Sequence, residues 1–159
     1  MELRIGQGVD CHPYDERADR RLVLGGVALD GPGLRGHSDA DAVAHAAADA
    51  LLGAAGLGDI GVHFPDTDPR WAGADSVALL AEVARLVRAE GWRPANVDCT
   101  VVADQPRLAP HRDAMQERLS GAVGAPVTVK GKRTEGLQGP GSPAGVTCFA
   151  IALLVREGS

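Results

Sequence analysis

The sequence has few aromatic residues and no surplus of positive charge. Aromatic residues make up 3% of the 159 residues, so the hydrophobic core must consist mainly of Ala, Val, Leu and Ile. The formal net charge is −5 without a basic stripe, which argues against an electrostatic nucleic-acid-binding surface. Hydrophobic residues at 45% and charged residues at 23% are close to the globular average, which argues against wholesale disorder.

Cysteines are also scarce, and long apolar runs are missing. Cys11, Cys99 and Cys148 are odd in number and widely spaced, which favours buried thiols in a reducing compartment over a disulfide framework. The N-terminal residues contain no apolar segment typical of a secretory signal. The longest apolar run, at residues 146–155, is about half of the ~20 residues that a membrane-spanning helix needs. We therefore expect a cytoplasmic protein that does not enter a membrane.

The length of the chain and its hydrophobic pattern predict one domain over residues 1–159. The order β-β-α-α-β-α-β-β is typical of an α/β (α+β) two-layer sandwich, in which helices cover one face of a single mixed sheet. We expect Ser38 to open the first helix, with Asp41 as its capping-box partner, and Gly56 and Gly91 to end the first two helices. Strands are expected at 3–9, 22–27, 97–103, 127–129 and 146–155, and helices at 38–55, 76–90 and 110–123.

Asp10 and His12 lie two residues apart at the end of the first predicted strand, so their side chains point to one face. A carboxylate and an imidazole in this arrangement are suitable ligands for a divalent metal. The same pair also occurs by chance at an ordinary solvated strand end. Neither interpretation is excluded by these two residues alone.

The first predicted helix contributes a second set of polar residues. Asp41, His45 and Asp49 are spaced by four, which aligns them on one helix face. Together, Asp10, His12 and His45 could supply three metal ligands and leave the fourth position open, as in catalytic zinc sites. The polar stripe equally fits a surface-exposed helix face.

Two further segments are rich in polar residues. Residues 58–61 and 64–68 contain Asp and Gly in a density typical of turns, and their acceptors would suit sugar hydroxyls. Residues 130–135 combine three cations with a hydroxyl and a carboxylate at the end of a predicted strand. This set could hold a phosphate and a second metal, or it could be a solvated charged strand end.

The order of these blocks resembles the 2-C-methyl-D-erythritol 2,4-cyclodiphosphate synthase family. The resemblance extends from Arg4 to the last strand and is strongest between His37 and Asp68. The matching blocks are Asp10-x-His12, His37-Ser38-Asp39-x-Asp41, His45, Asp49-Ala50-Leu51-Leu52-Gly53, Gly58-Asp59-Ile60-Gly61, Phe64-Pro65-Asp66-Thr67-Asp68, Gly73-Ala74-Asp75-Ser76 and Thr134-Glu135.

The resemblance implies a homotrimer with active sites between subunits and with sheets that face the threefold axis. It implies conversion of 4-diphosphocytidyl-2-C-methyl-D-erythritol 2-phosphate to the 2,4-cyclodiphosphate with release of CMP, in the non-mevalonate isoprenoid pathway. Asp10, His12 and His45 would bind zinc. Glu135 would hold magnesium or manganese on the substrate diphosphate.

The resemblance also implies roles in catalysis and substrate binding. His37, in a mobile loop over the substrate with Ser38, would help to stabilise the transition state. Arg133 occupies a position at which the family has a threonine expected to aid the transition state. The expected substrate-binding residues are Asp10, His12, His37 and Ser38; Asp59, Ile60 and Gly61 at a sugar portion, with Phe64, Pro65, Asp66, Thr67 and Asp68 nearby; Ala103, Pro106, Arg107, Leu108 and Ala109 at the cytosine; and Lys132, Arg133, Thr134 and Glu135.

The residues suit this chemistry. The nucleophile is the substrate's own 2-phosphate and the leaving group is the phosphate of CMP, so positioning and charge stabilisation should dominate over acid–base catalysis. Two metals with Lys132 and Arg133 would supply the positive charge that an acidic chain lacks. The family usually has threonines at positions 132 and 133, and Gly139, Ser142 and Ala144 replace residues that approach the cavity on the trimer axis.

Two alternatives to the cyclase are open at this point. One is a divergent member that binds a cytidine nucleotide and hydrolyses it. The other is a non-catalytic trimer that binds metal and cytidine nucleotide, which only the changed Lys132-Arg133 segment favours.

Overall fold

Four strands form the mixed sheet of the protein. The computed structural model describes residues 1–15, 19–139 and 144–158. The strand order is β1-β6-β4-β5, with β1 and β4 antiparallel to the central β6 and β5 parallel to β4. The mixed sheet predicted from the sequence is confirmed. The strands are β1 (Glu2–Pro13), β4 (Arg93–Val102), β5 (Val127–Lys132) and β6 (Gly145–Arg156).

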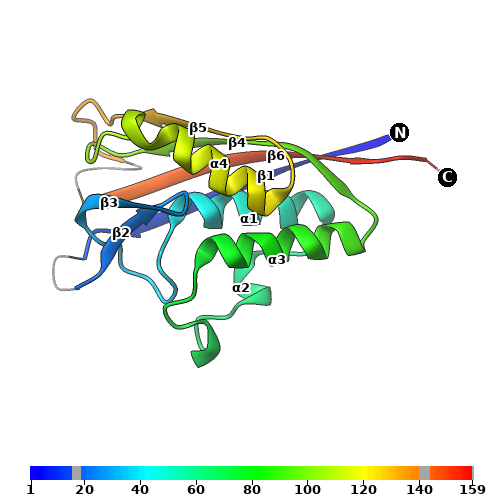
Figure 1. Cartoon of the computed structure of the whole chain (residues 1–159), viewed down its shortest axis with the longest axis horizontal. Helices are drawn as coiled ribbons and strands as arrows, with labels where there is room; N and C mark the ends of the chain where they lie inside the picture. The colour runs from blue at the N-terminus through cyan, green and yellow to red at the C-terminus, as the bar shows by residue number, and fades with distance from the viewer. Residues whose placement is uncertain (16–18, 140–143, 159) are drawn as a thin grey trace.

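The three long helices lie on the same side of this sheet (Figure 1). Helix α1 (Ala42–Ala55) contacts β1 and β6, while α3 (Ser76–Ala89) packs against both α1 and α4 (Arg112–Val123). The core consists largely of Ala, Val and Leu, as the composition predicts. Cys99 and Cys148 are buried in it as free thiols, whereas Cys11 is exposed.

Two glycines of β1 allow α1 to approach the sheet closely. A Cβ atom at Gly8 would lie 1.9 Å from the carbonyl oxygen of Ala46, and one at Gly6 would lie 2.0 Å from that of Ala50. Since the helix backbone occupies this space, a larger residue fits at neither position. Asp10 follows Gly8 on the same face of the strand, so the close packing brings it beside His45 of α1.

The prediction of one continuous strand at residues 22–27 is wrong. The segment forms two strands, β2 (Arg21–Leu24) and β3 (Val27–Pro32), which pair with each other outside the four-stranded sheet. Gly25 and Gly26 between them have φ angles of +58° and +73°. Such left-handed conformations make a tight turn within what resembles a continuous apolar run.

The predicted start of the first helix is also wrong. Asp41, rather than Ser38, is the N-cap of α1 and accepts hydrogen bonds from the backbone N–H groups of Val43 and Ala44. Asp41 also accepts from Gly25 at 2.8 Å and Gly26 at 2.7 Å, so it connects the hairpin to the helix. Because Asp41 is fully buried, the interpretation of this polar stripe as a solvent-exposed face is wrong at its first residue.

The other boundaries differ by smaller amounts. The loop predicted at 58–68 contains the short helix α2 (Ile60–His63), followed by a 3₁₀ turn at Pro69–Trp71, and another 3₁₀ turn (Ala109–His111) precedes α4. Helix α1 ends at left-handed Gly56 as predicted, and α3 ends one residue earlier than predicted, with Gly91 in a left-handed conformation just beyond it. None of the helices in the described ranges is long and apolar enough to cross a membrane.

Candidate metal centre and active site

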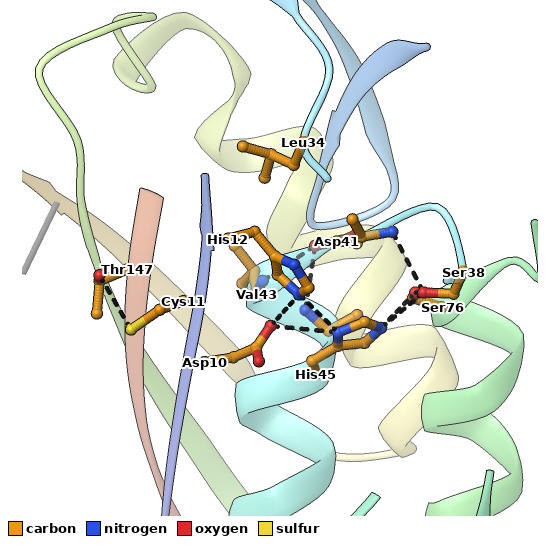
Figure 2. Close-up of polar contacts among 12 residues, drawn as sticks. Asp10, Cys11, His12, Leu34, Ser38, Asp41, Val43, His45, Ser76 and Thr147 are labelled. Atoms are coloured by element: carbon orange, nitrogen blue, oxygen red, sulfur yellow. Dashed lines mark hydrogen bonds and ion pairs between the residues drawn. The ribbon is translucent and has the colours of Figure 1, made fainter. Parts of the chain in front are cut away.

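Asp10, His12 and His45 converge where the end of β1 meets the start of α1 (Figure 2). Asp10 Oδ2 lies 2.8 Å from His12 Nε2 and 3.2 Å from His45 Nδ1, and these two ring nitrogens are 3.4 Å apart. Two ligands of a tetrahedral zinc ion with bonds of about 2.1 Å are separated by about 3.4 Å. Two of the three spacings are close to this value and the third is shorter. The three ligands predicted from the sequence are therefore adjacent in space.

A backbone carbonyl fixes the orientation of the His12 ring. His12 Nδ1 lies 2.6 Å from the carbonyl oxygen of Arg35. Because a carbonyl can only accept, Nδ1 must donate its hydrogen, and the neutral ring then has its lone pair on Nε2. That lone pair faces Asp10 and His45. Histidine ligands in metal sites typically have their second nitrogen held in this way.

The electrostatics of the triad favour a positive charge between its members. Burial raises the pKa of Asp10, but hydrogen bonds with His12 and His45 outweigh it and hold the pKa at about 2. Burial lowers the pKa of His12, yet the hydrogen bond with Asp10 raises it above its ordinary value. The Asp10 carboxylate thus stabilises positive charge beside the rings, as protons or as a divalent ion. Two imidazoles and one carboxylate are a donor set that fits zinc.

A cavity of about 410 Å³ opens beside the triad. His12 and His45 form part of its wall, and the segment from α2 to the Pro69–Trp71 turn forms another part. Phe64 and Trp71 pack edge to face there, with ring centroids 5.0 Å apart. We call this the triad cavity. Its other lining residues predicted from the sequence are His37, Ser38, Ile60, Gly61, Pro65 and Asp66, and those not predicted are Gly36, Trp71 and Leu79.

Two predicted residues near this cavity, Asp59 and Asp68, have local structural partners. Asp59 caps α2 by accepting a hydrogen bond from Val62 N–H at 3.0 Å. Asp68 pairs with Arg70 at 2.6 Å, and its carbonyl lies 3.0 Å from His37 Nε2. Thr67 is exposed. The contact with the Asp68 carbonyl therefore holds the ring of His37, which lines the triad cavity.

Asp49, the last residue of the predicted polar stripe, connects α1 to this region. Its carboxylate accepts a hydrogen bond from Ile60 N–H at 2.7 Å, at the start of α2. Burial raises the pKa of Asp49, and the bond from Ile60 acts against this. The three residues of the predicted stripe thus have different structural roles. Asp41 caps α1, His45 belongs to the triad, and Asp49 binds the start of α2.

A second cavity, of about 420 Å³, contains the predicted cytosine segment. Lys132 and Arg133 from the end of β5 line it together with Arg107 and Arg112. This concentration of positive charge in an acidic chain suits an anionic ligand. We call it the cationic cavity. Its other lining residues are Ala103, Asp104, Pro106, Leu108, Ala109, Val129 and Gly131. Arg112 and Val129 lie outside the two segments that the sequence predicted here, 103–109 and 130–135.

Thr134 and Glu135 follow Arg133, a residue of the cationic cavity, in the sequence. Their environments differ. Thr134 is buried, and its hydroxyl donates to Asp104 Oδ2 at 2.8 Å while its N–H donates to Oδ1 at 2.9 Å. These bonds lower the pKa of Asp104. Glu135 is exposed, with a φ of +54°. Lys130 is a solvated strand residue that pairs with Asp98, so this part of the strand-end interpretation is right.

Ser76 is a polar residue of the site that the sequence did not point to. Its hydroxyl lies 2.8 Å from His45 Nε2, at the start of α3, and it also contacts Asp39. Ser76 and Asp39 both fall within blocks of the family resemblance, and this was the signal in the sequence that could have identified them. Their separation in the sequence is too large for any local periodicity to pair them.

Comparison with known proteins identifies the family. The model of the YgbB family matches residues 3–155 of this chain. The chain belongs to this family. A relative from Dechloromonas aromatica (strain RCB), named 2-C-methyl-D-erythritol 2,4-cyclodiphosphate synthase, is 50% identical over 162 residues, which cover 99% of this chain and 100% of that protein.

Two further relatives extend the comparison. The "Bifunctional enzyme IspD/IspF" of Anaeromyxobacter dehalogenans (strain 2CP-C) is 54% identical over 157 residues, which cover 97% of this chain but 40% of that protein. A solved structure of 2C-methyl-D-erythritol-2,4-cyclodiphosphate synthase in its CDP-bound form has a TM-score of 0.85 and 43% identity, covering 96% of this chain and 100% of that one. All three relatives bear enzyme names, which gives no support to the non-catalytic alternative.

Proposed function

We propose that this chain converts 4-diphosphocytidyl-2-C-methyl-D-erythritol 2-phosphate into 2-C-methyl-D-erythritol 2,4-cyclodiphosphate and CMP. An oxygen of the 2-phosphate forms a bond to the diphosphate phosphorus that is attached to the erythritol. The bond between that phosphorus and the bridging oxygen breaks, and this oxygen leaves as part of CMP. The convergence of Asp10, His12 and His45 beside a cavity supports this proposal, in a chain that belongs to this family. The single domain and the cytoplasmic location remain predictions from the sequence.

Asp10, His12 and His45 would hold zinc, and Glu135 would hold magnesium or manganese with the substrate diphosphate. Bound zinc would act as a Lewis acid on a phosphate oxygen. The residues of the chain would provide positioning and charge. Because the nucleophile is already anionic, none of them needs to remove a proton from it.

We assign the substrate-binding roles by cavity. His37, Ser38 and the segment from Asp59 to Asp68 would bind the erythritol phosphate in the triad cavity. In the cationic cavity, Lys132 and Arg133 would contact the phosphates of the nucleotide, beside the cytosine segment. No described residue lines both cavities. The substrate would need the two sets of residues at one site, and we propose that a second copy of the chain supplies one of them, as the family resemblance implies.

A homotrimer with active sites between subunits would meet this need. The face of the sheet opposite the helices exposes Ile5 by 74% and Ile151 by 53%. Exposed apolar side chains on one face are typical of a protein interface. We propose that these faces meet at a threefold axis. Of the replaced residues near that axis, Gly139 and Ala144 are exposed, and Ser142 lies outside the described residues.

The products decide the proposed function. The purified protein is incubated with the substrate, zinc and magnesium, and the phosphorus NMR spectrum is followed with time. Formation of the cyclic diphosphate and CMP in equal amounts supports the proposal. A linear diphosphate or monophosphates would identify a hydrolase, and an unchanged spectrum would refute the cyclase and favour the non-catalytic alternative.

Replacing Ile5 by glutamate is expected to prevent trimer formation and to lower the activity with it. A carboxylate there would be buried without a partner in the assembly. Sedimentation-velocity ultracentrifugation measures the change in mass. Ala81→Glu is the control, since Ala81 is exposed on α3 and lines neither cavity, and it should leave the mass unchanged. A fully trimeric Ile5→Glu variant would refute the proposed interface.

Replacing Arg133 by alanine is expected to lower kcat by at least about tenfold, with a smaller loss of CMP affinity. The reason is that a guanidinium acting on charge that develops at phosphorus contributes more in the transition state than in the ground state. Steady-state kinetics and calorimetric titration with CMP measure the two quantities. Lys130→Ala is the matched control, because Lys130 pairs with Asp98 rather than lining the cationic cavity. Equal losses of kcat and CMP affinity would instead assign Arg133 to ground-state binding.

A further inference from the structure

Two residues contact the His45 ring on the side away from the triad. Ser76 and Ser38 place their hydroxyl oxygens 2.8 Å and 3.1 Å from His45 Nε2, while Nδ1 faces Asp10 (Figure 2). Ser76 in turn contacts the Asp39 carboxylate with its hydroxyl and, at 3.1 Å, with its N–H. We propose that Asp39 and Ser76 are positioning residues that fix the ring in the tautomer with its lone pair on Nδ1. The proposal rests on metal binding by the triad, as part of the proposed function.

The direction of the hydrogen bonds follows from the Asp39 carboxylate. An ionised carboxylate only accepts, so the Ser76 hydroxyl donates its one hydrogen to Asp39. The Ser76 oxygen is then available only as an acceptor toward His45. Nε2 must therefore donate, which leaves the lone pair of the neutral ring on Nδ1, beside Asp10 and His12.

The opposite tautomer could donate from Nδ1 to Asp10 at 3.2 Å, but it would lose the shorter hydrogen bond from Nε2 to Ser76. With its hydrogen on Nδ1, the ring would bring the Nε2 lone pair within 2.8 Å of a Ser76 oxygen that has no hydrogen left to give. The Ser38 hydroxyl could donate to Nε2, but this would leave the contact with Ser76 repulsive. Ser38 does not by itself favour one tautomer of His45. Its oxygen accepts a hydrogen bond from Ala40 N–H at 3.2 Å, and its own hydrogen can be donated to Ser76 at 3.2 Å.

Burial and backbone contacts make this arrangement rigid. Ser76 is 1% exposed, so water cannot replace a missing hydrogen bond there without a change in packing. The segment around Asp39 is held against the start of α3 by hydrogen bonds from Asp39 N–H to Ala74 at 3.0 Å and from Gly73 N–H to His37 at 2.8 Å. The backbone thus fixes the position of the Asp39 carboxylate. The carboxylate orients the Ser76 hydroxyl, and this hydroxyl determines the tautomer of the His45 ring.

Ser76→Ala tests the proposal through metal affinity. We expect zinc to bind roughly 10–100-fold more weakly, as is typical when a partner of a histidine ligand is removed. Competition with a chromophoric chelator measures the zinc dissociation constant without reference to activity. Ser76→Thr retains the hydroxyl and should recover most of the affinity. A zinc dissociation constant of Ser76→Ala within about twofold of the wild type would overturn the proposal.

Asp75→Ala is the matched control for an effect on the helix alone. Asp75 is exposed and caps the same end of α3, where it accepts a hydrogen bond from Val77 N–H at 2.9 Å. Its replacement should lower the melting temperature and leave the zinc dissociation constant unchanged. If Asp75→Ala weakened zinc binding as much as Ser76→Ala does, the role of Ser76 would be merely structural and the proposal would fail.

Nitrogen-15 NMR of the His45 ring tests the tautomer in the wild-type chain, with no variant that could misfold. In the zinc-loaded protein we expect a hydrogen on Nε2 and the metal on Nδ1. The metal-free protein, at a pH at which the ring is neutral, should show the same tautomer. A hydrogen on Nδ1 in the metal-free protein would overturn the proposal. A wild-type chain that binds no zinc would instead refute the metal assignment in the proposed function.

Discussion

Replacing His45 by alanine is expected to abolish zinc binding and to lower turnover by at least about a hundredfold. The variant leaves only Asp10 and His12, which are two residues apart on one strand and cannot hold a tetrahedral ion well. Loss of a Lewis acid that stabilises the transition state by several kcal/mol corresponds to a rate loss of at least about a hundredfold. Elemental analysis of the purified variant and steady-state kinetics measure the two losses.

His111→Ala is the control for the loss of a histidine. His111 lies in the 3₁₀ turn before α4 and lines neither cavity. Its replacement should leave the zinc content at the wild-type value. The His45→Ala variant should also keep its helical circular dichroism, because alanine favours the helix in which it would stand. Full zinc occupancy in folded His45→Ala would refute the assignment of the ligands.

Replacing Gly8 by alanine is expected to destabilise the protein by about 3 kcal/mol or more. This value is at or above the upper end of the free-energy range that is typical of overpacking substitutions. The added Cβ would lie 1.9 Å from the Ala46 carbonyl oxygen and 2.7 Å from Ala50 N, and helix backbone cannot rotate away as a side chain can. The strand and α1 must therefore separate. For a chain of this size the melting temperature should fall by at least about 6 °C. Thermal unfolding followed by circular dichroism measures it.

Gly53→Ala is the matched control on the other side of the same interface. A Cβ at Gly53, within α1, would meet only the Gln7 carbonyl oxygen at 3.8 Å. Since alanine is the better helix former, this change should be neutral or stabilise by up to about 1 kcal/mol. An equal loss of stability in the two variants would show that the close approach at Gly8 is not the cause. Because α1 positions His45, Gly8→Ala should also weaken zinc binding.

The helices and strands with regular patterns could be predicted from the sequence. The apolar stripe of α3, the alternation in β4 and the glycines after α1 and α3 each depend on neighbours within a few residues. The hairpin of β2 and β3 was missed because Gly25 and Gly26 interrupt an apolar run that otherwise matches a single strand. The N-cap of α1 was assigned to Ser38, since a serine followed three residues later by an acidic residue has the same local pattern.

The candidate site divides in a similar way. Asp10, His12 and His45 could be named from residue type and from the family resemblance, since their spacing predicts shared faces on a strand and on a helix. Arg112 of the cationic cavity gave no comparable signal. Its contribution depends on how α4 lies beside β5, which no local pattern describes.

The sequence by itself determined the long helices, most strands of the mixed sheet, the acidic charge, the identity of the three metal-ligand candidates and the family. These follow from residue type and short-range spacing. Only the tertiary structure decided that Gly8 brings α1 against β1, that Asp41 is buried between a hairpin and a helix, and that Ser76 meets His45. The physical reason is that each of these contacts joins residues far apart in the chain, and packing alone brings them together.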